Sequence, residues 1–217
     1  MIKLRAVFEK TGRAKYISHL DLNRCMLRIF RRSGLPIWYT EGFNPHPYFS
    51  FALALSLGFE SDCEILDFNL NEDISYETIK ERLNAVMPAG MKISRVYTPK
   101  MKITAIAKAE YRVELLSDSP EILLKDVKKL HAAEEILIEK KTKKGIKTVD
   151  LKPSIEMKSI SQDDKKIVVN MCLPAGTQTN FNPNLFIEAL RNTAEIPFET
   201  GNISRTGIYC ENNEIFS

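Results

Sequence analysis

The chain has 217 residues, of which 44% are hydrophobic and 27% charged, so it is long enough to bury a core without disulfide or metal staples. No stretch approaches the roughly 20 apolar residues of a membrane-spanning helix, and residues 1–10 lack the apolar run of a signal peptide. The four cysteines lack the C-x-x-C spacing of zinc and iron–sulfur sites. We therefore expect a cytoplasmic protein that enters no membrane and holds no metal or cofactor.

The first half of the chain predicts alternating strands and helices. Residues 2–9 (IKLRAVFE) alternate apolar and polar side chains, as a half-buried strand does. Ser18 is expected to cap a helix over 19–33, with Asp21 at the capping-box position and Gly34 at the end. The remaining elements are a strand over 35–40, a strand or packed loop over 49–57, a strand over 64–70, a helix over 74–87 and a strand over 91–97. This is the βαββαβ order of a ferredoxin-like unit.

The second half predicts a similar order. Its elements are a strand over 111–116, a helix over 120–130, a strand over 135–140, a hairpin over 154–160 and 165–173, a helix over 183–192 and a strand over 203–210. That is a ferredoxin-like unit with one extra strand. We therefore expect an α+β fold of two tandem ferredoxin-like units with antiparallel sheets, over 1–98 and 109–217, joined by a linker over 99–108.

Basic residues gather in two places, although the net charge is only +3. Residues 1–50 hold nine Lys or Arg against three Asp or Glu, whereas residues 51–98 hold four against eight. The arginines of helix 19–33 lie opposite its apolar face; they are Arg24, Arg28, Arg31 and Arg32. The second place is the loop or hairpin tip over 140–152, with Lys141, Lys143 and Lys144. Both places predict RNA binding, because arginine suits bidentate phosphate contacts and mobile lysines touch nucleic-acid backbones. The alternative for each is a solvated face that only aids solubility.

The stretch YTEGFNPHPYFSF, residues 39–51, predicts a recognition loop. Prolines on both sides of His46 restrict the backbone and lower the entropy lost on binding. Its candidate contact residues, Phe43, Asn44, His46 and Tyr48, would stack on bases or dock a protein partner. The alternative is a packed cover over the sheet.

Catalytic candidates are few. His19, with Tyr16 nearby, would form a small polar site with His46 if the loop folded back over the helix start. Such a site would suit metal-independent cleavage of RNA. The alternative is that His19 caps or packs and that the loop is a stiff turn. Two histidines without a third ligand predict no metal site.

Three segments within residues 8–68 carry a family resemblance: Ser-His-Leu-Asp-Leu at Ser18–Leu22, Arg-x-Gly-Leu-Pro at Arg32–Pro36 and Gly-Phe-Asn-Pro-His-Pro at Gly42–Pro47. On these motifs the chain resembles the radical-SAM-linked bacterial domain-of-unknown-function family, in its stand-alone form. The resemblance implies a radical SAM protein as partner, because members are fused to one or encoded beside one. The chain has no C-x-x-x-C-x-x-C cluster motif, so it cannot itself be the radical enzyme.

We therefore expect a non-catalytic accessory protein that binds RNA for a radical SAM enzyme in RNA modification or processing. The alternatives are a metal-independent endoribonuclease that uses His19 or His46, and a scaffold that binds protein alone.

Overall fold

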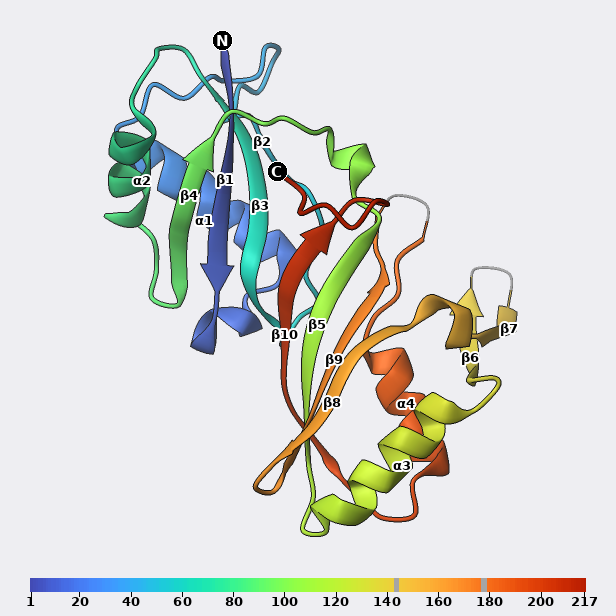
Figure 1. Cartoon of the computed structure of the whole chain (residues 1–217). Helices are drawn as coiled ribbons and strands as arrows, with labels where there is room; N and C mark the ends of the chain where they lie inside the picture. Colours follow the sequence, from blue (N-terminus) through green and yellow to red (C-terminus); the bar gives the residue numbers. More distant parts are fainter. Residues whose placement is uncertain (143–144, 177–178) are drawn as a thin grey trace. The chain divides into compact units, whose positions relative to one another are not determined.

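The computed structural model of the chain describes residues 1–142, 145–176 and 179–217 (Figure 1). These residues divide into two compact units: one holds Met1–Ala105 with Phe216–Ser217, and the other holds Ile106–Ile215. The chain passes between the units inside the segment expected as the linker, 99–108, after a short 3-10 helix over Ile103–Ala105.

The first unit contains four strands that pair antiparallel in the order β4-β1-β3-β2. Their bounds are β1 Ile2–Lys10, β2 Phe49–Phe51, β3 Glu60–Leu70 and β4 Met91–Tyr97. Ile2 lies opposite Leu70, and Arg5 lies opposite both Asp67 and Tyr97. Because side chains alternate between the two faces of a strand, Ile2, Leu4, Ala6 and Phe8 of β1 point to one face, and Lys3, Arg5 and Val7 point to the other.

Helices α1 (His19–Arg32) and α2 (Tyr76–Asn84) cover the apolar face of these strands. Their buried side chains share one core with β1, β3 and β4; the members from α1 are Leu22, Met26, Ile29 and Phe30. Ser18 caps α1 as predicted, since its Oγ accepts a hydrogen bond from the Asp21 backbone N–H at 3.2 Å. Just beyond α1, Gly34 adopts a positive φ of 65°, where a side chain would be strained.

Two predicted elements of this unit differ in the structure. The segment predicted as a strand over 35–40 makes only isolated bridges, from Ile37 to Leu70 and from Tyr39 to Pro47, because the chain leaves the sheet here to form a loop. The helix predicted over 74–87 is shorter. It ends at Asn84, whose side-chain amide bonds the backbone N–H and C=O of Ile93 in β4.

The second unit also contains four strands that pair antiparallel, in the order β10-β5-β9-β8. Their bounds are β5 Lys108–Leu116, β8 Glu156–Asp163, β9 Lys166–Pro174 and β10 Glu199–Tyr209. Helices α3 (Pro120–Ala132) and α4 (Asn184–Thr193) belong to this unit. The strand predicted over 135–140 is present as β6 (Leu137–Thr142), but the single extra strand predicted for this unit is wrong, because a further strand, β7 (Gly145–Asp150), follows β6. Strands β6 and β7 pair with each other as a separate two-stranded sheet.

Taken by chain order within each unit, the sheet strands are arranged fourth, first, third and second in both. A helix follows the first strand and another precedes the fourth in each case. The predicted α+β class is confirmed, with four α-helices in the described residues and antiparallel pairing throughout the described ladders. None of the described helices is long and apolar enough to cross a membrane.

Candidate nucleic-acid interface

The solvent-facing side of α1 carries the predicted arginines, and the structure exposes all four. Arg24 pairs with Asp21 at 3.1 Å, as its spacing predicts. Hydrogen bonds from Ser18 and then Arg24 lower the pKa of the Asp21 carboxyl. Within the described ranges, Arg28, Arg31 and Arg32 have no carboxylate partner and no hydrogen-bond acceptor. They therefore present unneutralised positive charge to solvent.

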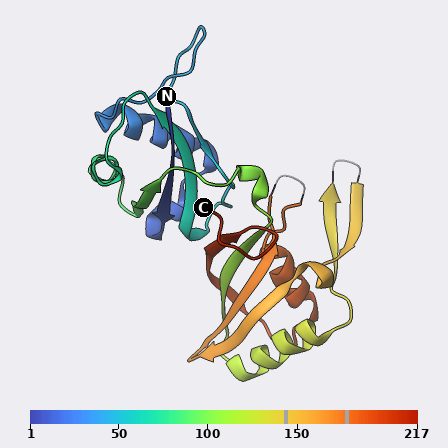
Figure 2. The same cartoon turned by 45° about the horizontal axis from the view of Figure 1, so that its top comes forward.

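The loop between α1 and β2 forms a hairpin over residues 38–48, which projects from its own unit (Figure 2). Thr40 N–H donates to the His46 carbonyl at 2.9 Å, and Tyr48 N–H donates to the Trp38 carbonyl at 3.0 Å. Residues 41–46 at the tip are all exposed, and Phe43 is fully exposed. Only residues 33–37 separate the last residue of α1 from this hairpin, so its stem begins close to the end that carries Arg31 and Arg32.

Hydrogen bonds within the hairpin orient His46. Its Nδ1 lies 3.0 Å from the Asn44 carbonyl and 3.2 Å from Thr40 Oγ1, and its backbone N–H also donates to Thr40 Oγ1. A carbonyl only accepts, so the neutral imidazole carries its proton on Nδ1 and leaves the lone pair on Nε2. The tip therefore presents an imidazole held by hydrogen bonds and, separately, an exposed phenyl ring.

The structure does not bring the catalytic candidates together. His19 opens α1 and packs edge-on against Phe51, with ring centroids 5.6 Å apart, and Tyr16 stands exposed just before it. The His46 hairpin follows the opposite end of α1, whose 14 residues span about 20 Å. In the part of the chain that the structure describes, neither Tyr16 nor His19 contacts His46. The polar site that required the loop to fold back over the helix start does not form.

The structure describes the predicted lysines of the 140–152 segment only in part. Lys143 and Lys144 lie outside the described residues, and only the backbone of Lys141, in β6, is described. Among the described residues, no group of three His, Cys, Asp or Glu side chains is arranged to hold a metal ion.

A cavity of about 420 Å³ lies at the base of the hairpin, within the first unit. Its lining includes Lys3, Trp38, Tyr48, Ser50, Asp67 and Asn69. Of these, only Tyr48 is among the residues that the sequence singles out. The missed signal is Trp38, the one tryptophan of the chain and the first residue of a hairpin that is already rich in aromatics. Lys3, Asp67 and Asn69 carry no local signal, since strand pairing alone brings them beside it.

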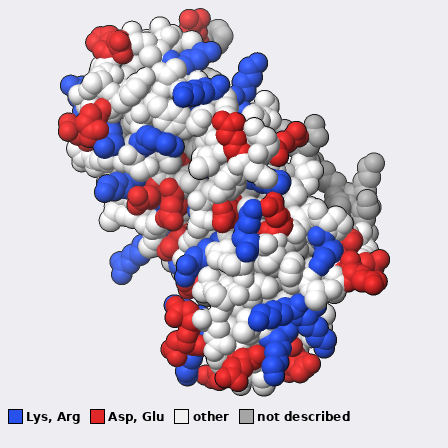
Figure 3. All heavy atoms as spheres, in the orientation of Figure 1, with Lys and Arg blue, Asp and Glu red and all other residues white. Residues whose placement is uncertain are grey.

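This cavity lies on the face of the sheet opposite α1. In Figure 1, α1 runs behind the strands of the first unit, so Figure 3, in the same orientation, shows the face that α1 does not cover. Basic side chains stand on that face too; among them Lys3, Lys92 and Arg95 are exposed.

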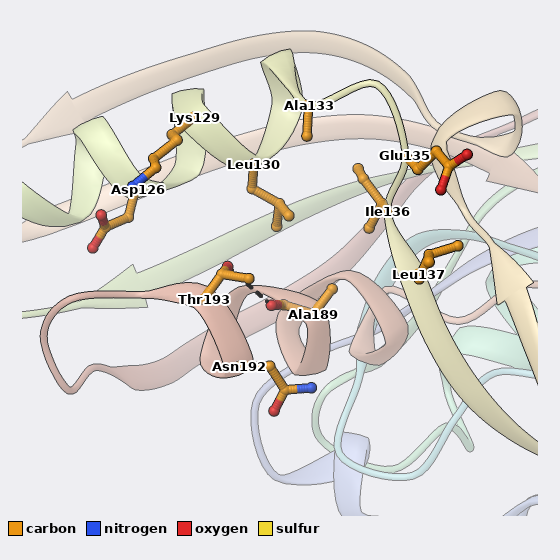
Figure 4. A pocket seen from close by; sticks show the side chains of 10 residues that line it. All are labelled: Asp126, Lys129, Leu130, Ala133, Glu135, Ile136, Leu137, Ala189, Asn192 and Thr193. Atoms are coloured by element: carbon orange, nitrogen blue, oxygen red, sulfur yellow. Dashed lines mark hydrogen bonds between the residues drawn. The ribbon is translucent and has the colours of Figure 1, made fainter.

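A second cavity, of about 440 Å³, belongs to the other unit (Figure 4). Leu130 and Ile136 point from the α3 side toward α4. The Asp126 carboxylate in its lining already accepts the Glu195 backbone N–H at 3.0 Å. The lining combines Asp126 and Glu135 with a single cation, Lys129, so it offers no excess positive charge to a polyanion.

Comparisons with known proteins place the chain by family and by fold. A family profile described as "Uncharacterized protein conserved in bacteria (DUF2344)" matches residues 3–183. No curated protein matches the chain. A crystal structure of a Cbf5-Nop10-Gar1 complex contains a chain of similar fold, with a TM-score of 0.50 and 10% identity. The likeness covers 94% of the present chain but only 48% of that one, so this chain spans about half its length and the likeness concerns fold alone.

Proposed function

The chain belongs to the DUF2344 family of uncharacterized proteins conserved in bacteria, and for this member we propose an RNA-binding accessory function. The interface consists of the outer face of α1 and the 38–48 hairpin. The single observation that carries the proposal is that Arg28, Arg31 and Arg32 stand exposed with no partner among the described residues.

Arginine at these positions fits a phosphate backbone. The guanidinium donates two parallel hydrogen bonds to phosphate oxygens, and its plane stacks on bases. For solubility alone, a mixture of acidic and basic side chains would serve as well on this face. Instead, the outer face of α1 holds four arginines and a single acid, Asp21.

The hairpin supplies contacts to bases, which a helix that binds only the RNA backbone lacks. Phe43 offers a solvent-exposed ring on which a base stacks, and His46 offers Nε2 as a hydrogen-bond acceptor. Hydrogen bonds to Thr40 and Asn44 hold the tip in one shape before any ligand arrives, which reduces the entropy that binding costs. The interface thus combines phosphate contacts with base contacts.

We also propose that each unit is ferredoxin-like. Support comes from the strand order, fourth, first, third, second, which each unit repeats with a helix after its first strand and another before its last. The β6–β7 hairpin is then an insertion between α3 and β8 of the second unit.

A radical SAM enzyme is the partner that we propose, on the strength of the motif resemblance at residues 18–22, 32–36 and 42–47. Two of these motifs form the start of α1 and the hairpin tip. Tagged protein should retain the partner after ribonuclease treatment if the contact is direct. Loss of the partner on that treatment would mean that RNA alone joins them.

The experiment that tests RNA binding is a salt series. Pooled small bacterial RNA is titrated against the natural chain and against Arg28→Glu/Arg31→Glu/Arg32→Glu. Counterion release predicts that log affinity falls with log salt by about 0.7 per phosphate neutralised on a single strand, so losing three contacts should flatten the slope by about 2.

A matched control carries the same change in net charge on the other unit. Lys125, Lys128 and Lys129 are exposed on α3, and their triple glutamate variant should leave the slope close to that of the natural chain. Equal losses in both triple variants would show that net charge, not the α1 face, governs binding. No loss in the arginine variant would reject the proposed interface.

The endoribonuclease alternative has a separate readout. The exposed Nε2 of His46 is the one favourable observation for it, because His19 lies at the other end of α1. Labelled RNA incubated with the protein in EDTA should stay intact under our proposal. Cleavage that His46→Ala abolishes would replace the accessory function with a catalytic one.

A further inference from the structure

We propose that the cavity at the base of the 38–48 hairpin binds one nucleobase with its attached phosphate. The inference rests on the proposed RNA-binding function for the source of that base. It names a cavity that shares only Trp38 and Tyr48, the two ends of the hairpin, with the proposed interface. The same chemistry is offered by a base within an RNA strand and by a free nucleotide, and the test below separates these two sources.

The walls of the cavity are aromatic. The rings of Trp38 and Tyr48 lie edge to face, with centroids 5.5 Å apart and planes at 72°. Both residues line the cavity, and further apolar lining comes from Met1, Leu4, Pro99 and Ile103. A volume of about 420 Å³ lies within the usual range for a small-molecule pocket. A flat heteroaromatic ring is the ligand that such walls accept by stacking.

The floor of the cavity is polar because strand pairing gathers polar residues there. Asn69 lies opposite Lys3 in the β1–β3 ladder, and Ser50 lies opposite Asp67 in the β2–β3 ladder. Trp38 joins the same row, since its backbone N–H donates to the Asn69 carbonyl at 2.9 Å. The backbone that carries the Trp38 ring is therefore hydrogen-bonded to the backbone of the strand that carries Asn69.

Several of these polar groups have hydrogen-bonding capacity left over. Asn69 is only 5% exposed, and its Nδ2 contacts the Met1 sulfur, a weak acceptor, at 3.3 Å. Its Oδ1, the Ser50 hydroxyl and the Trp38 indole N–H make no hydrogen bond to any described residue. An amide that presents both a donor and an acceptor pairs with the complementary edge of a base.

Charge in the pocket suits a phosphate. Asp67 is neutralised by the buried Arg5, whose Nε and Nη2 lie 2.6 and 2.8 Å from its carboxylate oxygens. Lys3 is exposed and has no carboxylate partner among the described residues, so it leaves an unneutralised positive charge in the lining. A nucleoside with a phosphate therefore fits better than a nucleoside alone.

The test uses Trp38 as its own reporter, because it is the only tryptophan of the chain. The full-length protein is titrated with adenosine, guanosine, cytidine and uridine 5′-monophosphates, with ribose 5-phosphate, and with five-residue oligoribonucleotides. We expect saturable quenching of Trp38 by at least one base-bearing ligand and none by ribose 5-phosphate. Quenching by oligoribonucleotides but not by monophosphates identifies an RNA strand as the source of the base. Quenching by a monophosphate with the same affinity as by the oligoribonucleotides identifies a free nucleotide.

Three variants assign the quenching to the pocket. Tyr48→Ala and Asn69→Ala should each weaken binding about tenfold, as loss of a stacking ring or a base-edge contact does. Lys3→Glu changes an exposed side chain and should weaken binding of the monophosphates, so it keeps the test valid if Asn69→Ala fails to fold. Tyr76→Ala, an exposed tyrosine of α2 outside the pocket, should bind as the natural chain does.

Failure of this inference and failure of the α1 interface give different results. Absence of any Trp38 quenching overturns the pocket, whatever the salt series shows. Quenching that persists in the Arg28→Glu/Arg31→Glu/Arg32→Glu variant supports the pocket, whether or not that variant still binds long RNA. Quenching that Tyr48→Ala, Asn69→Ala and Lys3→Glu all leave unchanged also overturns it.

Discussion

Removing the Asp67 carboxylate should destabilise the first unit more than any other single change of an acidic side chain described above. Arg5 in β1 is 1% exposed, and the ring of Phe216 lies 4.5 Å from its guanidinium carbon. The Asp67 carboxylate accepts hydrogen bonds from Nε and Nη2 of Arg5, while Nη1 of Arg5 is buried without a hydrogen-bond partner in the described residues. In Asp67→Ala the guanidinium would keep its charge and its burial and lose its counter-ion.

The size of the loss follows from that burial. Removing one partner of a buried ion pair costs about 3–5 kcal/mol, because the remaining charge is left uncompensated. Asp67 itself is 22% exposed, so water can partly replace it, and we expect the lower end, about 3 kcal/mol in the free energy of unfolding. Replacing both partners, in Arg5→Met/Asp67→Leu, removes the stranded charge and should cost no more than about 1 kcal/mol.

Urea unfolding followed by Trp38 fluorescence measures this, since the single tryptophan lies in the first unit. Asp62→Ala is the matched control, because Asp62 is an exposed aspartate of the same strand, and its midpoint should hardly move. If Asp67→Ala lost less than about 1 kcal/mol, or if the double replacement were the less stable of the two, the reasoning from an uncompensated buried charge would be wrong.

Three further predictions concern backbone strain and titration. Gly90→Ala should lower the free energy of unfolding in urea by about 3 kcal/mol, because φ is +81° and an added Cβ would lie 2.4 Å from the Thr11 backbone oxygen. Gly12 also has a positive φ but open space around it, so Gly12→Ala should lower this free energy by only about 1 kcal/mol. Burial raises the pKa of the Cys172 thiol to about 11, so iodoacetamide at pH 8 should label this thiol about 100-fold more slowly than a cysteine of the unfolded chain. Equal labelling rates of Cys172 in native and urea-unfolded protein would contradict this. Burial and then the Lys152 ammonium lower the pKa of His131, so Lys152→Ala should raise this pKa in an NMR titration yet leave it below its ordinary value. Because the folded-state pKa is the lower one, the contribution of His131 to stability is present above the unfolded-state pKa and is lost as the pH falls from there through the folded-state pKa.

Local features of the sequence were enough to predict α1. Ser18 at the cap, apolar residues at helical spacing and Gly34 at the end act within one or two turns, so no distant contact is needed to specify them. The arginine face follows from the same spacing and is exposed as expected. Alternation likewise predicted β1 and β4 within one residue at each end.

Local features could not predict the parts that depend on distant partners. The segment over 35–40 reads as a strand by composition, yet its pairing is decided by β3 and by the return of the hairpin. Arg5 lies at a polar position of an alternating strand, so the sequence pattern predicts that its side chain faces solvent. It is buried because Phe216, more than 200 residues further along the chain, packs over it.

The sequence by itself therefore determined the α+β class, the amphipathic helix and the location of the aromatic loop around His46, since each depends on contacts between near neighbours. Tertiary structure decided that His19 and His46 stand at opposite ends of α1, and that Lys3, Trp38 and Asn69 share one cavity. The physical reason is that a side chain's neighbours across a sheet are set by register. Register depends on which strands pair and on where the chain turns, and no window of sequence around a single residue contains that information.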